Sequence, residues 1–371
     1  MLPFTRPTLD TEEFEAIKEV LQSGWLATGP KVAAFETALA DYIGGDVQLR
    51  VFNSGTSALE AVLLAYGIGP GDEVIVPAMS FVASANIIVR CGATPKFVDV
   101  DLISRNIDAD AVAAAITPNT KAVIPVHFAG RAVDMDPIYQ LAEQHDLLVL
   151  EDAAQAIGTQ YKGRRIGSLG NPVCFSFHPN KNMTTIEGGA LAINDPALLK
   201  KIEGIRFHGI ERDAQGGMDV TAWGGKMNMP DVSAALGLVQ LKKLDGFNRK
   251  RRALVERYFQ QLPVHDALVL PADDAEGHSW HMFCILLDWE KTGLNRNQTL
   301  EALKQQSIAA GIHYPAMHLF SLYRQYGYKP GDFPNAERIG EQTLTLPLFP
   351  GMEEKDVDRV CSAVISLLND S

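Results

Sequence analysis

A lysine with small and polar neighbours follows a short apolar run near the middle of the chain. Lys181 lies in the segment FSFHPNKNMTTIEGG (residues 175–189), close to Ser176 and His178. A loop lysine is usually a solvated charge, but desolvation lowers the pKa of an ammonium group and makes it an amine nucleophile. The glycine-rich surroundings of Lys181 indicate a loop that can enclose a ligand, and they favour Schiff-base chemistry.

An acidic pair ends an apolar run upstream of this lysine. The segment LLVLEDAAQ (residues 147–155) places Glu151 and Asp152 at the carboxyl end of a predicted buried strand. Open α/β sheets bind ligands at that edge, although an acid that turns into solvent is the common alternative. A carboxylate in this place is suited to a protonated pyridine nitrogen, a pairing that a pyridoxal cofactor needs to act as an electron sink.

A third segment, NSGTSAL (residues 53–59), connects a predicted strand to a predicted helix. Backbone amides at a helix N-terminus, together with Ser and Thr hydroxyls, bind anions such as a phosphate group. Ser and Thr are also ordinary helix N-caps, so this pattern alone is a weak signal. Phe81, in the segment PAMSF, could stack on a flat ring, with a place in the core as the alternative.

The elements around these segments predict an α/β fold. The 371 residues are enough for two domains. Short apolar and β-branched runs alternate with helical stretches from residue 51 to about 193, which indicates a mostly parallel sheet covered on both faces. The predicted strands are 51–53, 73–77, 94–99, 122–127, 147–151, 173–177 and 189–194, and the predicted helices include 31–43, 57–66 and 230–262.

The residues after the long helix predict a second, smaller domain. A loop at 268–273 is followed by a strand at 281–287 and by helices at 298–310 and 357–368. We therefore expect a large domain of residues 1–262, which includes the N-terminal segment and the long helix. A small α+β domain of residues 263–371 is expected to pack on it.

Composition narrows the possible functions. The chain carries 45 acidic and 33 basic side chains, a net charge of −12, which disfavours nucleic acid and anionic membranes as partners. The four cysteines form no CxxC pair, so we expect neither a metal site nor a disulfide framework. No segment has the length and apolarity of a signal peptide or a membrane span, and the expected location is the cytoplasm.

In this order, the phosphate segment, the aromatic residue, the strand-end acid and the loop lysine resemble fold type I pyridoxal-phosphate enzymes. More narrowly, the chain is similar to the DegT/DnrJ/StrS family of sugar aminotransferases, from about residue 3 to 360. The resemblance implies a large domain with a mostly parallel seven-stranded sheet and a small C-terminal α+β domain. The matching motifs are SGWLATGP (23–30), SGTSAL (54–59), GDEVIVP (71–77), GATP (92–95), FVDVD (97–101), EDAAQ (151–155), FSFH (175–178), Lys181, EGG (187–189) and LPLFP (346–350).

Three further stretches are most similar to family members that aminate UDP-4-keto-arabinose for lipid A modification. They are PVHFAG (125–130), GTQYKG (158–163) and RFHG (206–209). Residues 211–223 depart from the arabinose type, so the reaction is better defined by the resemblance than the substrate is.

The resemblance implies a role for each matching residue. Lys181 would bind pyridoxal 5′-phosphate covalently and Asp152 would face its pyridine nitrogen, so these two are the expected catalytic residues. The other expected cofactor contacts are Gln155 to the ring hydroxyl, Phe81 to the ring face, Gly55, Thr56 and Ser176 to the phosphate, and Asn228 to the phosphate in a neighbouring subunit. The expected substrate contacts are Trp25, Thr28, His178 and His318, with a structural position as the alternative for Trp25 and His318.

The expected reaction is transamination, because Lys181 is present where relatives that run dehydration chemistry have His. The resemblance implies a homodimer with shared active sites and an amino-acid donor, for which we expect L-glutamate. The expected acceptor is a 4-keto sugar on a nucleotide diphosphate, with UDP as carrier, in the biosynthesis of a cell-surface polysaccharide or lipid such as lipopolysaccharide.

Two alternatives stay open. The acceptor could instead be a 3-keto sugar or a free cyclitol, and a complete lack of affinity for nucleotide would favour the cyclitol. Outside catalysis, the chain could be a cofactor-binding protein without turnover. The presence of Lys181, Asp152 and Gln155 together argues against that last alternative.

Overall fold

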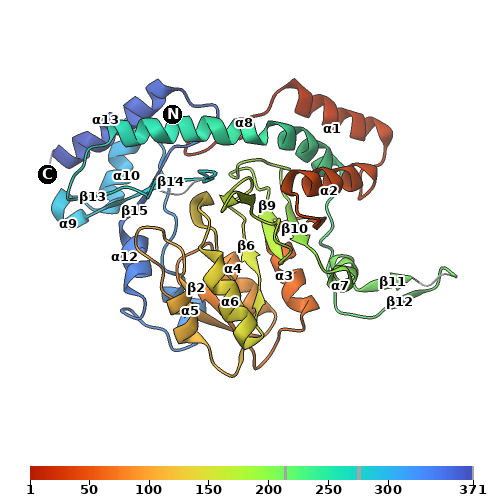
Figure 1. Cartoon of the computed structure of the whole chain (residues 1–371). Helices are drawn as coiled ribbons and strands as arrows, with labels where there is room; N and C mark the ends of the chain where they lie inside the picture. The colour runs from red at the N-terminus through yellow and green to blue at the C-terminus, as the bar shows by residue number, and fades with distance from the viewer. Residues whose placement is uncertain (213–214, 274–276, 370–371) are drawn as a thin grey trace.

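The computed structural model describes residues 1–212, 215–273 and 277–369. Residues 213–214, within the stretch 211–223 noted above, lie outside the described residues, as do 274–276 and 370–371 of the predicted small domain. The described chain forms a central sheet with helices packed around it and a smaller sheet near the C-terminal helix (Figure 1).

The central sheet consists of two blocks of four strands, in the orders β3–β2–β4–β5 and β1–β10–β9–β6. The blocks meet because β5 (Leu148–Val149) and β6 (Glu151–Asp152) are consecutive, with Leu150 between them. Within the blocks, every pairing is parallel except the two that β10 makes. The other strands are β1 (Gln48–Phe52), β2 (Glu73–Pro77), β3 (Thr94–Val98), β4 (Thr120–Val123), β9 (Val173–Ser176) and β10 (Gly189–Ile193). With β5 and β6 counted as one interrupted strand, this is the mostly parallel sheet of seven strands that was expected.

The strands are apolar on both faces because helices cover both faces. In β10, Ala190 and Ala192 belong to one buried cluster, and Leu191 and Ile193 belong to another on the opposite face. The first cluster includes side chains of α2 (Pro30–Ile43) and α8 (Asp231–Gln261), and the second those of α3 (Gly55–Ala65), α4 (Ala83–Arg90), α5 (Ala109–Ala115), α6 (Met135–His145) and α7 (Pro196–Arg206). Side chains buried on both faces explain the continuous apolar runs in the sequence.

A smaller antiparallel sheet forms from β13 (Leu268–Val269), β14 (Phe283–Leu287) and β15 (Thr343–Leu346). It packs with α10 (Arg296–Gln305), α12 (Pro334–Gln342) and α13 (Glu354–Asn369), near the end of the chain (Figure 1). Strand β13 occupies the start of the segment predicted as a loop, because Leu268 and Val269 pair with Leu287 and Leu286. Leu2 and the last turns of α8 join the core of this sheet, so the N-terminus lies with the C-terminal part of the chain. The division at residue 262 stays a prediction.

The remaining elements are short, apart from the N-terminal helix α1 (Thr11–Ser23), which packs along α8 (Figure 1). Two hairpins are formed by β7 (Gln160–Tyr161) with β8 (Arg164–Arg165) and by β11 (Ile210–Arg212) with β12 (Met218–Val220). The short helices are η1 (Phe128–Gly130), α9 (Trp289–Thr292), η2 (Met317–Leu319) and α11 (Ser321–Arg324).

Over the described ranges, we find no helix whose length and apolarity would let it span a membrane. The same residues contain no group of three or more His, Cys, Asp or Glu side chains placed to hold a metal ion.

Candidate active site

A cavity of about 450 Å³ lies where the loops after β1, β2, β6 and β9 meet the segment that follows Gly311. It brings together most of the residues that the sequence singled out. Those that line it are Gly55, Thr56, Phe81, Asp152, Gln155, Ser176, His178 and Lys181, and their neighbours in the wall include Ser80, Glu187, His313 and Tyr314. Residues far apart in the sequence thus converge on one chamber at the carboxyl ends of the parallel strands.

Lys181 is placed by a turn after β9. Its backbone N–H donates to the carbonyl of His178 at 2.8 Å, and the next residue, Asn182, is buried and donates to the carbonyl of Ser279 at 2.8 Å. Burial lowers the pKa of Lys181 to about 8, while the Asp152 carboxylate acts in the opposite direction. About a tenth of the amine is therefore unprotonated at pH 7, far more than for an ordinary lysine, and the unprotonated amine is the form that acts as a nucleophile.

Asp152 is buried, and its carboxylate is held on both oxygens. Oδ2 accepts a hydrogen bond from Ser84 Oγ at 2.7 Å, and Oδ1 accepts one from the backbone N–H of Ala154 at 3.1 Å. The backbone is fixed as well, because the Asp152 N–H donates to Pro125 at 2.9 Å and its carbonyl accepts from His127 at 3.1 Å. The result is an oriented negative charge in the cavity wall, which suits a protonated ring nitrogen.

The opposite end of the cavity is suited to a phosphate group. Ser54 caps α3, and its hydroxyl accepts the N–H of Ser57 at 3.1 Å. In the described part of the chain, the N–H groups of Gly55 and Thr56 have no hydrogen-bond acceptor, so both are available to an anion. A Cβ on Gly55 would lie 3.0 Å from the Cβ of Ser176, so glycine permits the close approach of α3 to β9.

Gln155 supplies a donor between these two ends. Its Oε1 accepts the backbone N–H of Ala129 at 2.7 Å, which turns the amide nitrogen away from Ala129. That nitrogen can only donate, so it suits a ring hydroxyl or its anion. A lysine, an oriented carboxylate, an amide donor and a helix N-terminus in one chamber fit a phosphorylated pyridine aldehyde.

Phe81 lies at the mouth of this chamber, and about half of its side chain is exposed. Its ring centroid is 5.9 Å from that of Tyr314, with the two planes inclined by 52°. Of the two interpretations that the sequence left open for Phe81, the geometry favours a ligand contact over a place in the core.

His318 does not line the cavity. Its ring is fully buried, its Nε2 lies 3.0 Å from Glu337 Oε1, and its ring packs edge-on against Phe333. The geometry therefore favours the structural interpretation of His318 over a direct contact with a sugar.

His313, five residues earlier, faces the cavity instead, and sequence reasoning missed it. Its Nδ1 lies 2.8 Å from Thr345 Oγ1, and its ring stacks on Phe4 at 5.0 Å. Burial, followed by the nearby Lys181 charge, lowers the pKa of His313 to about 4, so the ring is neutral at pH 7. The segment HYPAMH carried the signal, because it contains two histidines and the sequence does not tell which one turns inward.

Trp25, Thr28 and Asn228 meet one another but do not line the cavity of their own chain. Asn228 Nδ2 donates to Thr28 Oγ1 at 2.5 Å, and Trp25 Nε1 donates to the Thr28 carbonyl at 3.3 Å. The Trp25 side chain is 59% exposed, which is high for an indole ring. These three residues therefore lie together on the chain, apart from the cavity.

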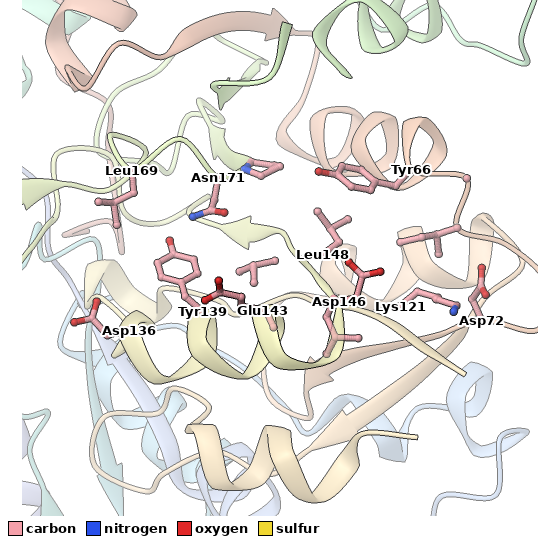
Figure 2. A pocket seen from close by; sticks show the side chains of 16 residues that line it. Tyr66, Asp72, Lys121, Asp136, Tyr139, Glu143, Asp146, Leu148, Leu169 and Asn171 are labelled. Carbon is pink, nitrogen blue, oxygen red and sulfur yellow. The ribbon is translucent and has the colours of Figure 1, made fainter. Parts of the chain in front are cut away.

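A hollow of about 1,050 Å³, larger than this chamber, lies elsewhere on the described part of the chain. Figure 2 shows it beside α6, with Tyr66, Lys121, Tyr139 and Leu169 among the labelled side chains. It contains none of the residues that the sequence predicted for the site. Size alone therefore does not locate the chemistry in this molecule.

Comparison with known proteins gives a consistent picture. A family model described as the DegT/DnrJ/EryC1/StrS aminotransferase family matches residues 7–365. The spore coat polysaccharide biosynthesis protein SpsC of Bacillus subtilis (strain 168) is 44% identical over 377 residues, which cover 98% of this chain and 96% of SpsC.

Solved structures match over the whole chain. The Streptococcus pneumoniae protein Spr1654 in its PMP-form superposes with a TM-score of 0.93 at 31% identity, with 100% of both chains covered, and a PLP-form of the same protein also matches. Helicobacter pylori PseC, an aminotransferase involved in the biosynthesis of pseudoaminic acid, gives a TM-score of 0.93 at 30% identity, also with 100% of both chains covered.

Proposed function

Because this chain belongs to the DegT/DnrJ/EryC1/StrS aminotransferase family, whose sugar aminotransferases depend on pyridoxal 5′-phosphate, we propose that it transfers an amino group from L-glutamate to a 4-keto sugar carried by UDP. The observation that carries the proposal is the chamber itself. It holds a lysine with a pKa of about 8, an oriented carboxylate and two free helix N–H groups.

Each residue of the chamber would have its own role in the reaction. When bound, pyridoxal phosphate supplies an electron sink for the carbon that loses its proton. Lys181 Nζ would hold the cofactor and would carry the proton that leaves the donor carbon and returns. Asp152 would keep a proton on the ring nitrogen, and Gln155 would donate to the ring hydroxyl. Phe81 would contact the ring, and Gly55, Thr56 and Ser176 would hold the phosphate.

The active form is a homodimer in which Asn228 reaches the phosphate site of the partner. Support comes from the separation of Asn228 and Trp25 from their own cavity. It also comes from a set of exposed large apolar side chains, most of them in or next to β11 and β12, a hairpin that extends away from the body of the chain (Figure 1). The set consists of Trp25, Leu26, Phe207, Met218, Val220 and Trp223. Such a surface on a single chain is typical of an interface.

Mixing two variants tests the shared site. A Lys181→Ala chain and an Asn228→Ala chain, allowed to exchange subunits and assayed at limiting cofactor, form hybrids with one intact site. Random exchange of equal amounts should restore about a quarter of the wild-type activity, because half of the dimers are hybrids. No recovery despite proven exchange, or an active monomer, would contradict the shared site.

The diphosphate of the acceptor needs cations, and the described residues that line the cavity include no arginine. Several basic residues are already engaged. Arg206 pairs with Glu36 at 2.8 Å, and buried Arg251 donates to the carbonyl of Leu348 at 2.9 Å. Two exposed basic residues are left: Arg212 lies at the end of β11 in the hairpin, and Lys226 donates to Asn228 Oδ1 at 2.6 Å. We assign the diphosphate contact to these two, reaching the site of the partner chain.

A half-reaction tests the acceptor. The protein is converted with L-glutamate to its amino form, UDP-4-keto sugars are added, and the return of the visible absorption band is followed. Arg212→Ala should raise the KM for the nucleotide sugar about ten-fold at nearly unchanged kcat, since a charge-assisted contact contributes about 1.5–3 kcal/mol. Lys250→Ala, which removes an exposed cation on α8, is the matched control. Discharge by free keto-cyclitols or simple oxo-acids, without discharge by nucleotide-linked 4-keto sugars, would show that the substrate class is wrong.

The relatives support a role in making surface polysaccharide. SpsC is named for spore coat polysaccharide biosynthesis, and PseC is described as an aminotransferase in the biosynthesis of pseudoaminic acid. The name of SpsC supports our proposal that this chain acts in cell-surface polysaccharide biosynthesis.

A further inference from the structure

The hydroxyl of Ser84 is buried behind the acid of the chamber and belongs to none of the motifs found in the sequence. Ser84 lies in the first turn of α4 and has no exposed surface. Its Oγ is 2.7 Å from Asp152 Oδ2, although the two residues are 68 positions apart in the sequence.

The single proton of this hydroxyl has a clear destination. Three oxygens lie near Ser84 Oγ: Asp152 Oδ2 at 2.7 Å, Ser80 Oγ at 3.2 Å and the Phe81 carbonyl at 3.3 Å. The shortest contact is also the one to a charged acceptor, and such hydrogen bonds are the strongest. The Ser80 hydroxyl is then free to donate to Ser84, which forms a chain from the cavity wall to the carboxylate.

This arrangement fixes the acid from the rear. The Ala154 N–H holds Oδ1 at 3.1 Å, and Ser84 holds Oδ2, so the carboxylate is restrained on both oxygens. We infer that Ser84 is a positioning residue that keeps the Asp152 carboxylate aimed at the ring nitrogen of the cofactor. The inference rests on the proposed role of Asp152, because Ser84 touches neither the cofactor nor the substrate.

Loss of the Ser84 hydroxyl should affect one end of the cofactor and spare the other. Without it, a buried oxygen loses its donor, and the carboxylate is free to rotate about the remaining contact to Ala154. That rotation weakens the contact with the ring nitrogen. The N–H groups of Gly55 and Thr56 at the phosphate end belong to α3 and are untouched.

A comparison of two cofactors that differ at one ring atom isolates the contact between Asp152 and the ring nitrogen. We compare the affinity of the full-length, cofactor-stripped protein for pyridoxal 5′-phosphate and for its 1-deaza analogue, in which a carbon replaces the ring nitrogen. Both bind Lys181 and the phosphate site alike, so the ratio of dissociation constants reports the contact at position 1. The wild type should prefer the natural cofactor by about ten-fold or more, as expected for a charge-assisted hydrogen bond.

Substitutions at position 84 should change that ratio alone. Ser84→Ala and Ser84→Cys, which nearly conserves the volume and is only a weak donor, should lower the preference about five-fold or more. Ser84→Thr keeps the hydroxyl and should keep most of the preference. Ser233→Ala, which removes another buried hydroxyl from α8, should match the wild type.

The outcomes separate the two claims. A wild type without preference, matched by Asp152→Asn, would refute the role of Asp152. A wild type with preference and Ser84→Ala or Ser84→Cys variants with the same preference would overturn the inference for Ser84 alone. Equal weakening of both cofactors would also overturn it, because that pattern means general damage to the fold. If Ser84→Ala fails to fold, the volume-conserving Ser84→Cys decides.

Discussion

Two neighbouring acids on strand β6 face opposite sides of the sheet, and their surroundings differ. Asp152 faces the cavity and accepts one hydrogen bond on each oxygen, which leaves acceptor capacity for a ligand. Glu151 points the other way, where His127 Nε2 lies 2.9 Å from one oxygen and the Tyr139 hydroxyl donates to the other. Both carboxylates are almost fully buried. Neither burial nor the number of hydrogen bonds therefore marks the functional acid, whereas a place in the wall of the cavity that holds Lys181 does.

The Glu151 side is built as a structural anchor. The His127 Nδ1 accepts the N–H of Val133 at 3.0 Å, so the ring proton lies on Nε2 and is donated to Glu151. Burial and then the Glu151 carboxylate raise the pKa of Tyr139, so its phenol stays a donor. Tyr139 belongs to α6 and borders the large hollow in Figure 2, so this network ties that helix to β6.

The largest effect should come from the cavity side, at Lys181. Lys181→Ala removes the amine that binds the cofactor, and activity should fall by at least about 10³-fold. Borohydride treatment of the wild type should attach the visible-absorbing group to a peptide that contains Lys181. Lys162→Ala, at an exposed lysine paired with Asp136, is the control and should keep wild-type activity. A label on a different lysine would overturn the assignment.

The next largest effect should come from Asp152→Asn, which keeps the shape of the side chain and removes its charge. We expect kcat to fall about 10²–10³-fold, because the carboxylate that keeps the ring nitrogen protonated, and so lets the ring accept electrons, is lost. The free energy of unfolding should fall by only about 1–2 kcal/mol, since Asn retains one acceptor for Ser84 or Ala154. Single-turnover kinetics and urea unfolding give the two numbers. A variant that loses stability and keeps kcat would place Asp152 in the same class as Glu151.

The reverse pattern is expected for Glu151→Gln. The amide nitrogen would face either His127 Nε2–H, which cannot accept, or the Tyr139 hydroxyl, which can accept only by losing Glu151 as the acceptor of its own proton. One buried hydrogen bond is lost in either case. The free energy of unfolding should fall by about 1–3 kcal/mol, whereas kcat of the folded protein should stay within about three-fold of the wild type. The same two measurements check it. A kcat loss equal to that of Asp152→Asn in a fully folded variant would erase the distinction between the two sides of β6.

The features that could be predicted from the sequence are those that depend on residues close together in the chain. Strand β2 (Glu73–Pro77) has the bounds predicted for it, since Gly71 and the strand-ending Pro77 mark it. The chain-order pattern of Lys181, Asp152 and Gln155 led to the family, and the family and its cofactor are confirmed. The roles of the individual residues stay predictions.

The missing parts depend on contacts between distant segments. Ser84 meets Asp152 only because the first turn of α4 ends up next to the acid on β6, and nothing in the sequence ASANIIVR marks it. The choice between His313 and His318 depends on how one loop enters the chamber. Leu2 joins the C-terminal core through pairing with Ile308, some 300 residues away, which no local pattern reveals.

The smallest predicted effect is on the free energy of unfolding, which the burial of Lys181 in the cavity lowers. The folded chain holds Lys181 at a pKa of about 8, against an ordinary value of 10.5 in the unfolded chain. Between these values the unfolded state binds more protons than the folded state, so this residue makes the protein more stable as the pH rises through that window. Below pH 8 the lysine is protonated in both states, and the cost of its buried charge is constant.

Comparison with Lys181→Met in the cofactor-free protein isolates this contribution, because all other titrating groups are shared. Lys181→Met should be the more stable chain at pH 7. The gap in the free energy of unfolding should narrow by about 1 kcal/mol between pH 7 and 9.5, after allowance for the solvent that reaches Nζ. Urea unfolding at several pH values measures the gap. If the free energies of unfolding of the two chains changed with pH in parallel, Lys181 would not be desolvated. The cavity side of β6 would then carry no stability cost from this lysine, and that difference from the Glu151 side would disappear.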